Sequence, residues 1–213
     1  MSNLDPDRYS AVDDGPEVEA RVKGSRFVGQ ALRVENEGRA VPRLDGVRRV
    51  HHAATHHCWA LRLGPPEAVV ERFGDAGEPA GTAGRPILDR LRGRDLYETL
   101  LVVTRYFGGT KLGTGGLARA YAEAADRALE AAPARTVRRE ARFVVRCSYD
   151  DLGTVEAAIA RAGDDVHRVE RDYDAGPRML VAVRRSRGAA LAATIVEATA
   201  GRAEARQSSS EET

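Results

Sequence analysis

The residues best suited to chemistry lie in a stretch from Arg105 to Tyr121 that reads RYFGGTKLGTGGLARAY. It holds five glycines within nine residues and one of only two lysines in the 213-residue chain. Glycine lets a ligand or another backbone come close, and consecutive backbone N–H groups in such a loop can form an anion-binding concavity. A loop that opens a helix adds the positive end of the helix dipole. The stretch therefore predicts a site for phosphate or another anion.

A second glycine-rich stretch, DAGEPAGTAGRP, runs from Asp75 to Pro86, and the other lysine precedes a glycine in VKGSRF. We expect anion or nucleic-acid binding by the basic residues in and beside these segments, namely Lys23, Arg26, Arg85, Arg105, Lys111 and Arg119. We expect the loops to be shaped by Gly77, Glu78, Gly81, Thr82, Gly84, Gly108, Gly109, Gly113, Thr114, Gly115 and Gly116. The alternative is that the glycines serve only the close packing of a helix on a sheet.

Enzyme chemistry finds little support in the residues. The Walker pattern is absent, and GTGGLA at 113–118 lies too far beyond its strand for the tight turn of a dinucleotide-binding fingerprint. The histidines of HHAATHHC stand at the start of a predicted strand, which breaks the helical spacing that a metal pair needs. Glu78 is the one carboxylate with a catalytic role if the protein is an enzyme, and otherwise it accepts backbone N–H groups. We expect no catalytic residue, no metal and no cofactor.

The elements that must position these loops follow from the apolar pattern. A buried strand is predicted over 97–107 and a helix over 115–132, joined by the first glycine-rich stretch. Residues 17–34 read as a hairpin and 55–64 as a strand. Shorter helices are expected at 42–52 and 86–94.

The pattern changes after a linker-like APAR at 132–135. The order βαββα, with a last edge strand near 202–207, matches a ferredoxin-like arrangement. The sequence thus predicts an α+β protein with a flexible acidic lead (1–16), a first domain (17–132), a ferredoxin-like domain (136–207) and a disordered tail (208–213).

Composition sets further bounds. The net charge of +1 does not by itself indicate a polyanion partner. Two cysteines far apart give no disulfide framework, and no apolar run is long enough for a membrane helix. We therefore expect the cytoplasm and no membrane partner.

Four segments, KGSRF, HHCWA, GEPAGTAGRP and RYFGGTKLGTGGLARAY, resemble the signature of the IMPACT protein family, also called the YigZ-type uncharacterised family, in its bacterial two-domain form. The resemblance implies a βαβ domain like domain 2 of ribosomal protein S-five, followed by a ferredoxin-like domain. It also implies a link with translation, because eukaryotic relatives regulate translation under starvation. One departure is visible: the family's Asp-Asp-Gly-Glu-Pro reads here as Asp75-Ala76-Gly77-Glu78-Pro79, which weakens any mechanism that needs two adjacent acids.

The residues and the resemblance together predict a non-enzymatic binding protein linked to translation regulation. Its partner is expected to be RNA, the ribosome or a translation-associated protein, bound through the glycine-rich basic loops. Two alternatives stay open: an enzyme that binds a nucleotide or phosphate ester, and a protein–protein adaptor with no anion site. The sequence leaves the oligomeric state undecided.

Overall fold

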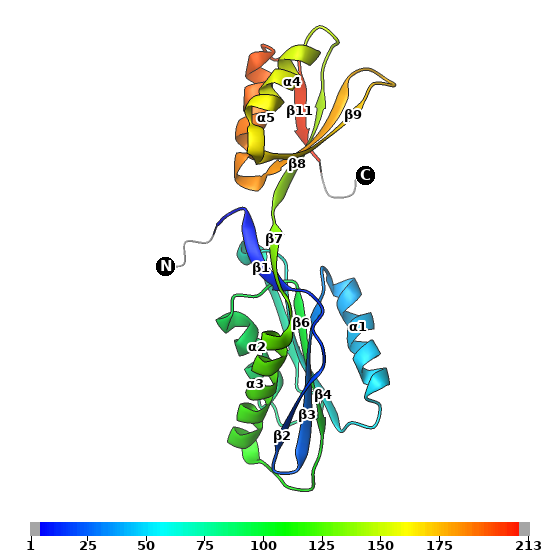
Figure 1. Ribbon diagram of the computed structural model, residues 1–213, viewed down its shortest axis with the longest axis vertical. Coiled ribbons are helices and arrows are strands. Elements are labelled where there is room, and N and C mark those ends of the chain that lie inside the picture. The colour runs from blue at the N-terminus through cyan, green and yellow to red at the C-terminus, as the bar shows by residue number, and fades with distance from the viewer. Residues whose placement is uncertain (1–4, 209–213) are drawn as a thin grey trace. The chain divides into compact units, whose positions relative to one another are not determined.

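The computed structural model describes residues 5–208 and places them in two compact units. The larger unit is Tyr9–Val137, and the smaller unit comprises Arg138 onward together with the residues up to Arg8. Each unit has its own hydrophobic core and combines helices with antiparallel sheet, which confirms the α+β class (Figure 1). Most of the predicted disordered tail, residues 209–213, lies outside the described residues.

The larger unit is built on a five-stranded sheet in the order β2-β3-β6-β4-β5, with every neighbouring pair antiparallel. The strands are β2 (Val18–Val22), β3 (Ser25–Arg33), β4 (His56–Leu63), β5 (Val70–Gly74) and β6 (Thr99–Tyr106). Helices α2 (Gly84–Gly93) and α3 (Gly113–Ala131) pack on one face, and α1 (Glu37–Val50) packs on the other. The predicted hairpin, central strand and long helix are confirmed.

The central strand β6 shows why its sequence is a continuous apolar run. Leu101 and Val103 belong to the core under α2 and α3, whereas Leu100 and Val102 belong to the core under α1. A strand covered on both faces has no solvent-facing row, so the polar alternation of a surface strand disappears.

Three elements differ from the sequence prediction. Helix α1 begins at Glu37, before the predicted start at Pro42, because the Asn36 side chain accepts the Arg39 N–H at 3.0 Å and caps the helix. The edge strand β5 is mostly exposed and lacks an apolar pattern. Strand β1 (Arg8–Val12) pairs with β7 (Ala134–Arg138), where a flexible lead and a linker were expected. This pairing joins residues more than a hundred positions apart, which no local pattern reports.

The smaller unit contains β8 (Glu140–Arg146), α4 (Leu152–Arg161), β9 (Val166–Asp172), β10 (Arg178–Arg184), α5 (Gly188–Ala198) and β11 (Glu204–Gln207). Its antiparallel sheet has the order β11-β8-β10-β9, and both helices pack on one face. This is the order of elements that the sequence predicts. The first described residues also belong here, since Asp7 accepts hydrogen bonds from the Ser186 backbone N–H at 2.6 Å and hydroxyl at 2.7 Å.

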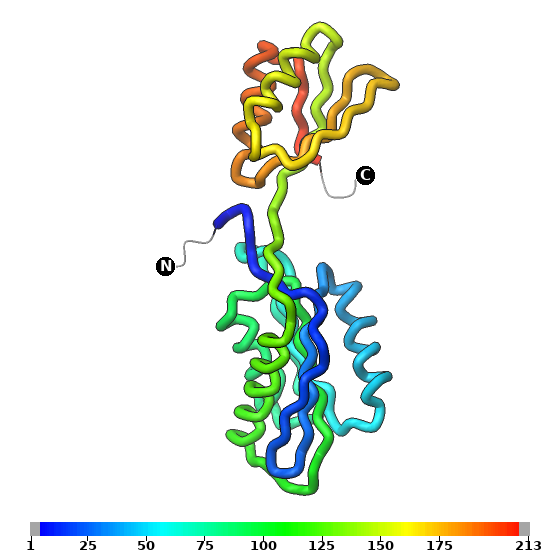
Figure 2. The backbone as a smooth tube through the Cα atoms, viewed as in Figure 1, coloured from blue at the N-terminus to red at the C-terminus, as the bar shows by residue number. Residues whose placement is uncertain are grey.

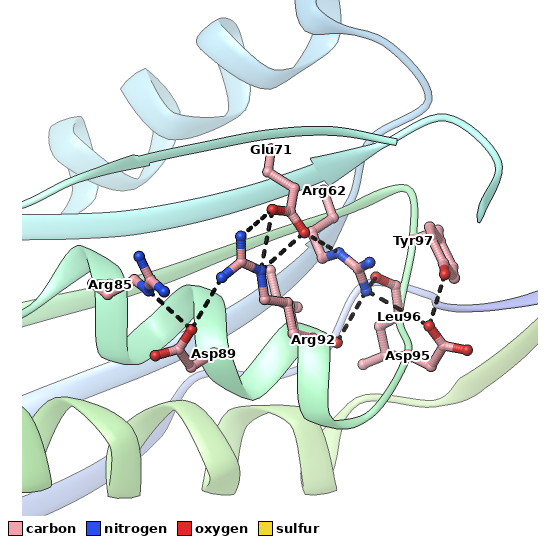
Figure 3. Close-up of polar contacts among 9 residues, drawn as sticks. Arg62, Glu71, Arg85, Asp89, Arg92, Asp95, Leu96 and Tyr97 are labelled. Carbon is pink, nitrogen blue, oxygen red and sulfur yellow. Dashed lines mark hydrogen bonds and ion pairs between the residues drawn. The ribbon is translucent and has the colours of Figure 1, made fainter. Parts of the chain in front are cut away.

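A polar network fastens the end of α2 to the sheet (Figure 3). Arg62 of β4, only 6% exposed, donates to Glu71 of β5 at 3.0 Å and to the Leu96 carbonyl at 3.0 Å. Its guanidinium also lies 4.4 Å from the centre of the Tyr97 ring. Arg92 of α2 donates to the same Glu71, and this hydrogen bond holds the pKa of Glu71 below its ordinary value. The buried arginine is thus paired rather than available to a ligand.

Helix α3 approaches the sheet closely at Gly29 of β3. A β-carbon there would lie 2.6 Å from the Ala124 carbonyl oxygen and 3.0 Å from the Ala128 β-carbon. We expect Gly29→Ala to lower the free energy of unfolding of the larger unit by about 1–3 kcal/mol through overpacking. Trp59, the one tryptophan of the chain, lies in β4 and reports this unit in a urea titration followed by fluorescence.

The matched control is Gly46→Ala in α1, where the nearest atom to a new β-carbon is an arginine side chain 3.9 Å away. This change should stabilise by about 0.5–1 kcal/mol, because alanine is the better helix former. Equal effects of the two substitutions would contradict the packing that the structure shows.

Candidate functional site

The four signature segments, scattered along the chain, meet at one end of the five-stranded sheet. Strand β3 begins beside the end of β6, where Arg26 pairs with Tyr106, and β4 begins there too, where His56 pairs with Arg105. The second glycine-rich loop joins them, since the Cys58 thiol donates to the Asp75 carbonyl at 3.0 Å. The β2–β3 turn and the loop that leads into α3 can be followed side by side at this end (Figure 2). We call residues 21–26, 51–58, 75–86 and 105–119 the loop end.

Two of these segments touch through bare backbone. Lys23 and Gly24 form the two-residue hairpin turn, with φ of 45° and 83°, as a type I′ turn requires. A β-carbon on Gly108 would lie 2.0 Å from the carbonyl carbon of Gly24. Only glycine fits at Gly108, so the close-packing explanation of the glycines holds at this position. The contact also places Lys23 beside the loop that carries Lys111.

Arg105 was expected to bind an anion, but the structure uses its charge internally. Its side chain is 5% exposed and donates to Glu78 at 2.6 Å and to the Ser25 hydroxyl at 3.3 Å. Glu78 is 4% exposed and also accepts the Tyr121 hydroxyl at 2.8 Å, with His56 Nε2 at 3.8 Å. Glu78 therefore joins side chains from β6 and α3, and it does not accept the backbone N–H groups that the sequence interpretation assigned to it.

The backbone of the second loop is held by Asp75 instead. Its carboxylate accepts N–H groups from Gly81 at 2.8 Å, Ala83 at 3.0 Å and Gly84 at 2.8 Å, where α2 begins. Sequence reasoning missed this role because Asp75 lies nine residues before Gly84, too far to be recognised as an N-cap. The replacement of the family's second acid by Ala76 leaves these bonds intact, because they come from the first acid.

The buried groups beside Glu78 are protonated at neutral pH. Burial, with the Glu78 and Asp75 charges adding to it, raises the pKa of the Cys58 thiol to about 12, against a smaller lowering by the hydrogen bond with Tyr121. Burial also raises the pKa of Tyr121, and its contacts with Cys58 and Glu78 add to the effect. Neither group supplies a nucleophile in this state. Among residues 5–208, no three His, Cys, Asp or Glu side chains group as metal ligands.

The exposed cations of the loop end are the remaining predicted ligands. Lys23, Lys111 and Arg119 are exposed, and no ion pair of theirs is found within the described residues. Arg26 lies 4.0 Å from the Tyr106 ring centre and pairs with Glu19 at 3.4 Å, while Arg85 pairs with Asp89 at 3.1 Å (Figure 3). Of the six basic residues predicted to bind an anion, three therefore have no ion pair among residues 5–208: Lys23, Lys111 and Arg119. Arg26 and Arg85 each have an ion pair, and Arg105 is buried with Glu78.

The predicted loop-shaping residues fall into three groups by the exposure of the whole residue. Thr82 and Gly84 are buried, Glu78 and Gly116 are half-buried, and the exposed ones are Gly77, Gly81, Gly108, Gly109, Gly113, Thr114 and Gly115. Helix α3 starts among the exposed ones with no side-chain cap and no acid in its first turn. Its first backbone N–H groups therefore have no side-chain cap, and the helix dipole there favours negative charge.

The Arg105–Glu78 pair can be tested by a double-mutant cycle. We expect Arg105→Ala to destabilise the larger unit by about 3–5 kcal/mol, because it leaves a buried carboxylate without its cation. Arg105→Ala with Glu78→Ala should cost less than the sum of the single changes in urea unfolding. Arg127→Ala, which breaks the exposed pair with Glu123, is the control and should cost less than about 0.5 kcal/mol. Strict additivity would contradict the coupling.

Thiol alkylation tests the chemistry of Cys58. The native protein should take up one iodoacetamide, at the half-buried Cys147, and slowly, because burial raises the pKa of that thiol; Cys58 should stay unmodified. Mass spectrometry of peptides from native and urea-unfolded protein would show this. Rapid native modification of Cys58 would show that its thiol is accessible and reactive.

Comparison with known proteins places this arrangement in a family. The model of the Impact N-terminal domain matches residues 23–129. The IMPACT family member YigZ of Escherichia coli is 32% identical over 185 residues, 86% of this chain and 90% of that protein. YvyE of Bacillus subtilis is 41% identical over 121 residues, 57% of this chain and 55% of that protein.

One solved structure agrees with this chain over most of its length. A crystal structure of a hypothetical protein covers 96% of this chain and 99% of its own, with 30% identity and a TM-score of 0.69. The two-domain translational regulator Yih1 covers 60% of this chain and 51% of its own, with 25% identity and a TM-score of 0.37, which is too low to show a shared overall fold. No helix of residues 5–208 is long and apolar enough to cross a membrane. The family model, the identity across most of the chain and the meeting of the four signature segments show that this chain belongs to the IMPACT family.

Proposed function

We propose that this protein is a non-enzymatic binding protein of translation regulation that acts in the cytoplasm and binds RNA, free or in the ribosome, through the loop end. One observation carries the proposal: the only two lysines of the chain, 88 positions apart, come to the same end of the sheet without an ion pair among residues 5–208. Unpaired surface cations that gather at one place are the electrostatic footprint of a phosphate-binding surface.

The backbone of the loop end supports the same proposal. The uncapped start of α3 presents N–H donors next to Lys111, and no acid stands in its first turn to compete with a phosphate. The carboxylates close by already have partners. Glu19 pairs with Arg21 and Arg26, and Glu78 pairs with Arg105. Little in the loop end therefore repels a polyanion.

The buried side chains of Glu78, Arg105, Tyr121 and Cys58 do not favour an enzymatic function. A general base needs a carboxylate that can take up a proton from a substrate, yet the Glu78 side chain is 4% exposed and bound by Arg105 and Tyr121. Cys58 is wholly buried as a thiol. We assign this cluster to holding the loops in shape.

Two finer statements about the fold belong to the proposal. The order β8-α4-β9-β10-α5-β11 and the strand order of the smaller unit support a ferredoxin-like domain. The family membership supports a larger unit like domain 2 of ribosomal protein S-five. The link with translation rests on the same membership, through the eukaryotic relatives that regulate translation.

The test is fluorescence anisotropy of a labelled structured RNA across a salt series. We expect binding that weakens steeply with salt, and a Lys23→Ala/Lys111→Ala variant whose plot of log K against log salt is flatter by about one to two units. Arg105 is left unchanged because its loss would damage the fold.

A matched control removes two other exposed cations of the same unit. Arg72→Ala/Arg127→Ala deletes the same charge outside the loop end, where each arginine already pairs with a glutamate. This variant should keep the wild-type slope. Absence of binding at low salt would overturn the proposal and favour the adaptor, and equal loss in both variants would show that only net charge matters.

A further inference from the structure

We propose that Phe107 is a stacking platform for an unpaired base, so that the nucleic acid bound at the loop end is single-stranded. The inference rests on the proposed function and names its substrate class. Phe107 is 48% exposed and lies between β6 and the first glycine-rich loop. Bases of any sequence can stack on an exposed aromatic ring of this kind.

The position of Phe107 is fixed by its surroundings. Its backbone N–H donates to the Thr55 hydroxyl at 3.2 Å, and the next residue, Gly108, packs against Gly24. The guanidinium of Arg105 lies 5.4 Å from the ring centre, and Arg105 is itself held by Glu78. The ring therefore rests against a buried cation on an ordered support, and a ring that is already ordered loses little entropy when a base stacks on it.

The charges around the ring suit a phosphate backbone. Lys23 lies in the turn that touches Gly108, one residue from Phe107, and Lys111 follows four residues after the ring. An aromatic side chain among exposed cations is the combination by which proteins hold single strands: the ring takes the base and the cations take the phosphates. A duplex keeps its bases paired and stacked, so it cannot use the ring.

The exposed tyrosines of the smaller unit differ from Phe107 in the charge of their neighbours. Tyr173 is 42% exposed but stands between Asp172 and Asp174, and Tyr149, 64% exposed, is followed by Asp150. Acidic neighbours repel phosphate, so exposure alone does not make these rings stacking sites. Tyr173 is thus a control of similar exposure for Phe107.

The experiment measures the affinity of the full chain for two fluorescein-labelled RNAs, an unstructured single strand of mixed sequence and a duplex of the same strand with its complement. We expect tighter binding of the single strand by the wild type. Phe107→Ala should lose about tenfold or more of this affinity and leave duplex affinity unchanged. Phe107→Tyr should keep the affinity, and Tyr173→Ala should behave as wild type.

Phe107→Leu retains the apolar bulk of the side chain but has no aromatic ring, so it should lose affinity for the single strand as Phe107→Ala does. Because it keeps this bulk, its loss of affinity cannot be attributed to a folding defect caused by a smaller side chain. Trp59 fluorescence in urea verifies the fold of each Phe107 variant, because both residues lie in the larger unit. Equal binding of single strand and duplex, unchanged in Phe107→Ala and Phe107→Leu, would overturn the inference and leave the charge-based function standing. Absence of binding to either RNA by the wild type would overturn both.

Discussion

The buried ion pair between Arg105 and Glu78 is the constraint on which the loop end depends. Each partner comes from a different segment, and the Tyr121 hydroxyl of α3 completes the acceptor set of Glu78. The pair thus ties the end of the central strand, the second glycine-rich loop and the long helix to one another. A buried charge is tolerated only with its partner in place, so the loops have one arrangement that satisfies both groups. The exposed loops are held from beneath by this unexposed pair.

Glycine serves two purposes at the loop end, and the structure separates them. At Gly108 the lack of a side chain is needed for backbone contact with Gly24, which is packing. At Gly113 a β-carbon would meet nothing within 4 Å, and no side chain caps the helix that starts there. A count of glycines in the sequence could not tell these purposes apart, because the deciding neighbour is 84 residues away along the chain.

Much of the fold could be predicted because its signals are local. The apolar run of β6, the small residues of α3 and the Lys23–Gly24 turn each carry their own pattern. The β1–β7 pairing could not be predicted because its two strands are more than a hundred positions apart, and the edge strand β5 could not because it is mostly exposed and lacks an apolar pattern. For the candidate site, the sequence singled out segments that the structure brings to one end of the sheet, but not which of their charges lack an ion pair. Arg105 looks like Lys111 in the sequence, and only burial distinguishes them.

The division of the chain into two units means that they can complete their folding at different times during synthesis. The larger unit is one continuous stretch, Tyr9–Val137, whereas the smaller unit joins the first described residues to the last third of the chain, with Asp7 bonded to Ser186. The larger unit is therefore an insertion in the smaller one. It can fold while the chain is still being made, but the smaller unit must wait for its own C-terminal half. A chain interrupted after the larger unit would carry a folded loop end and an unfolded smaller unit.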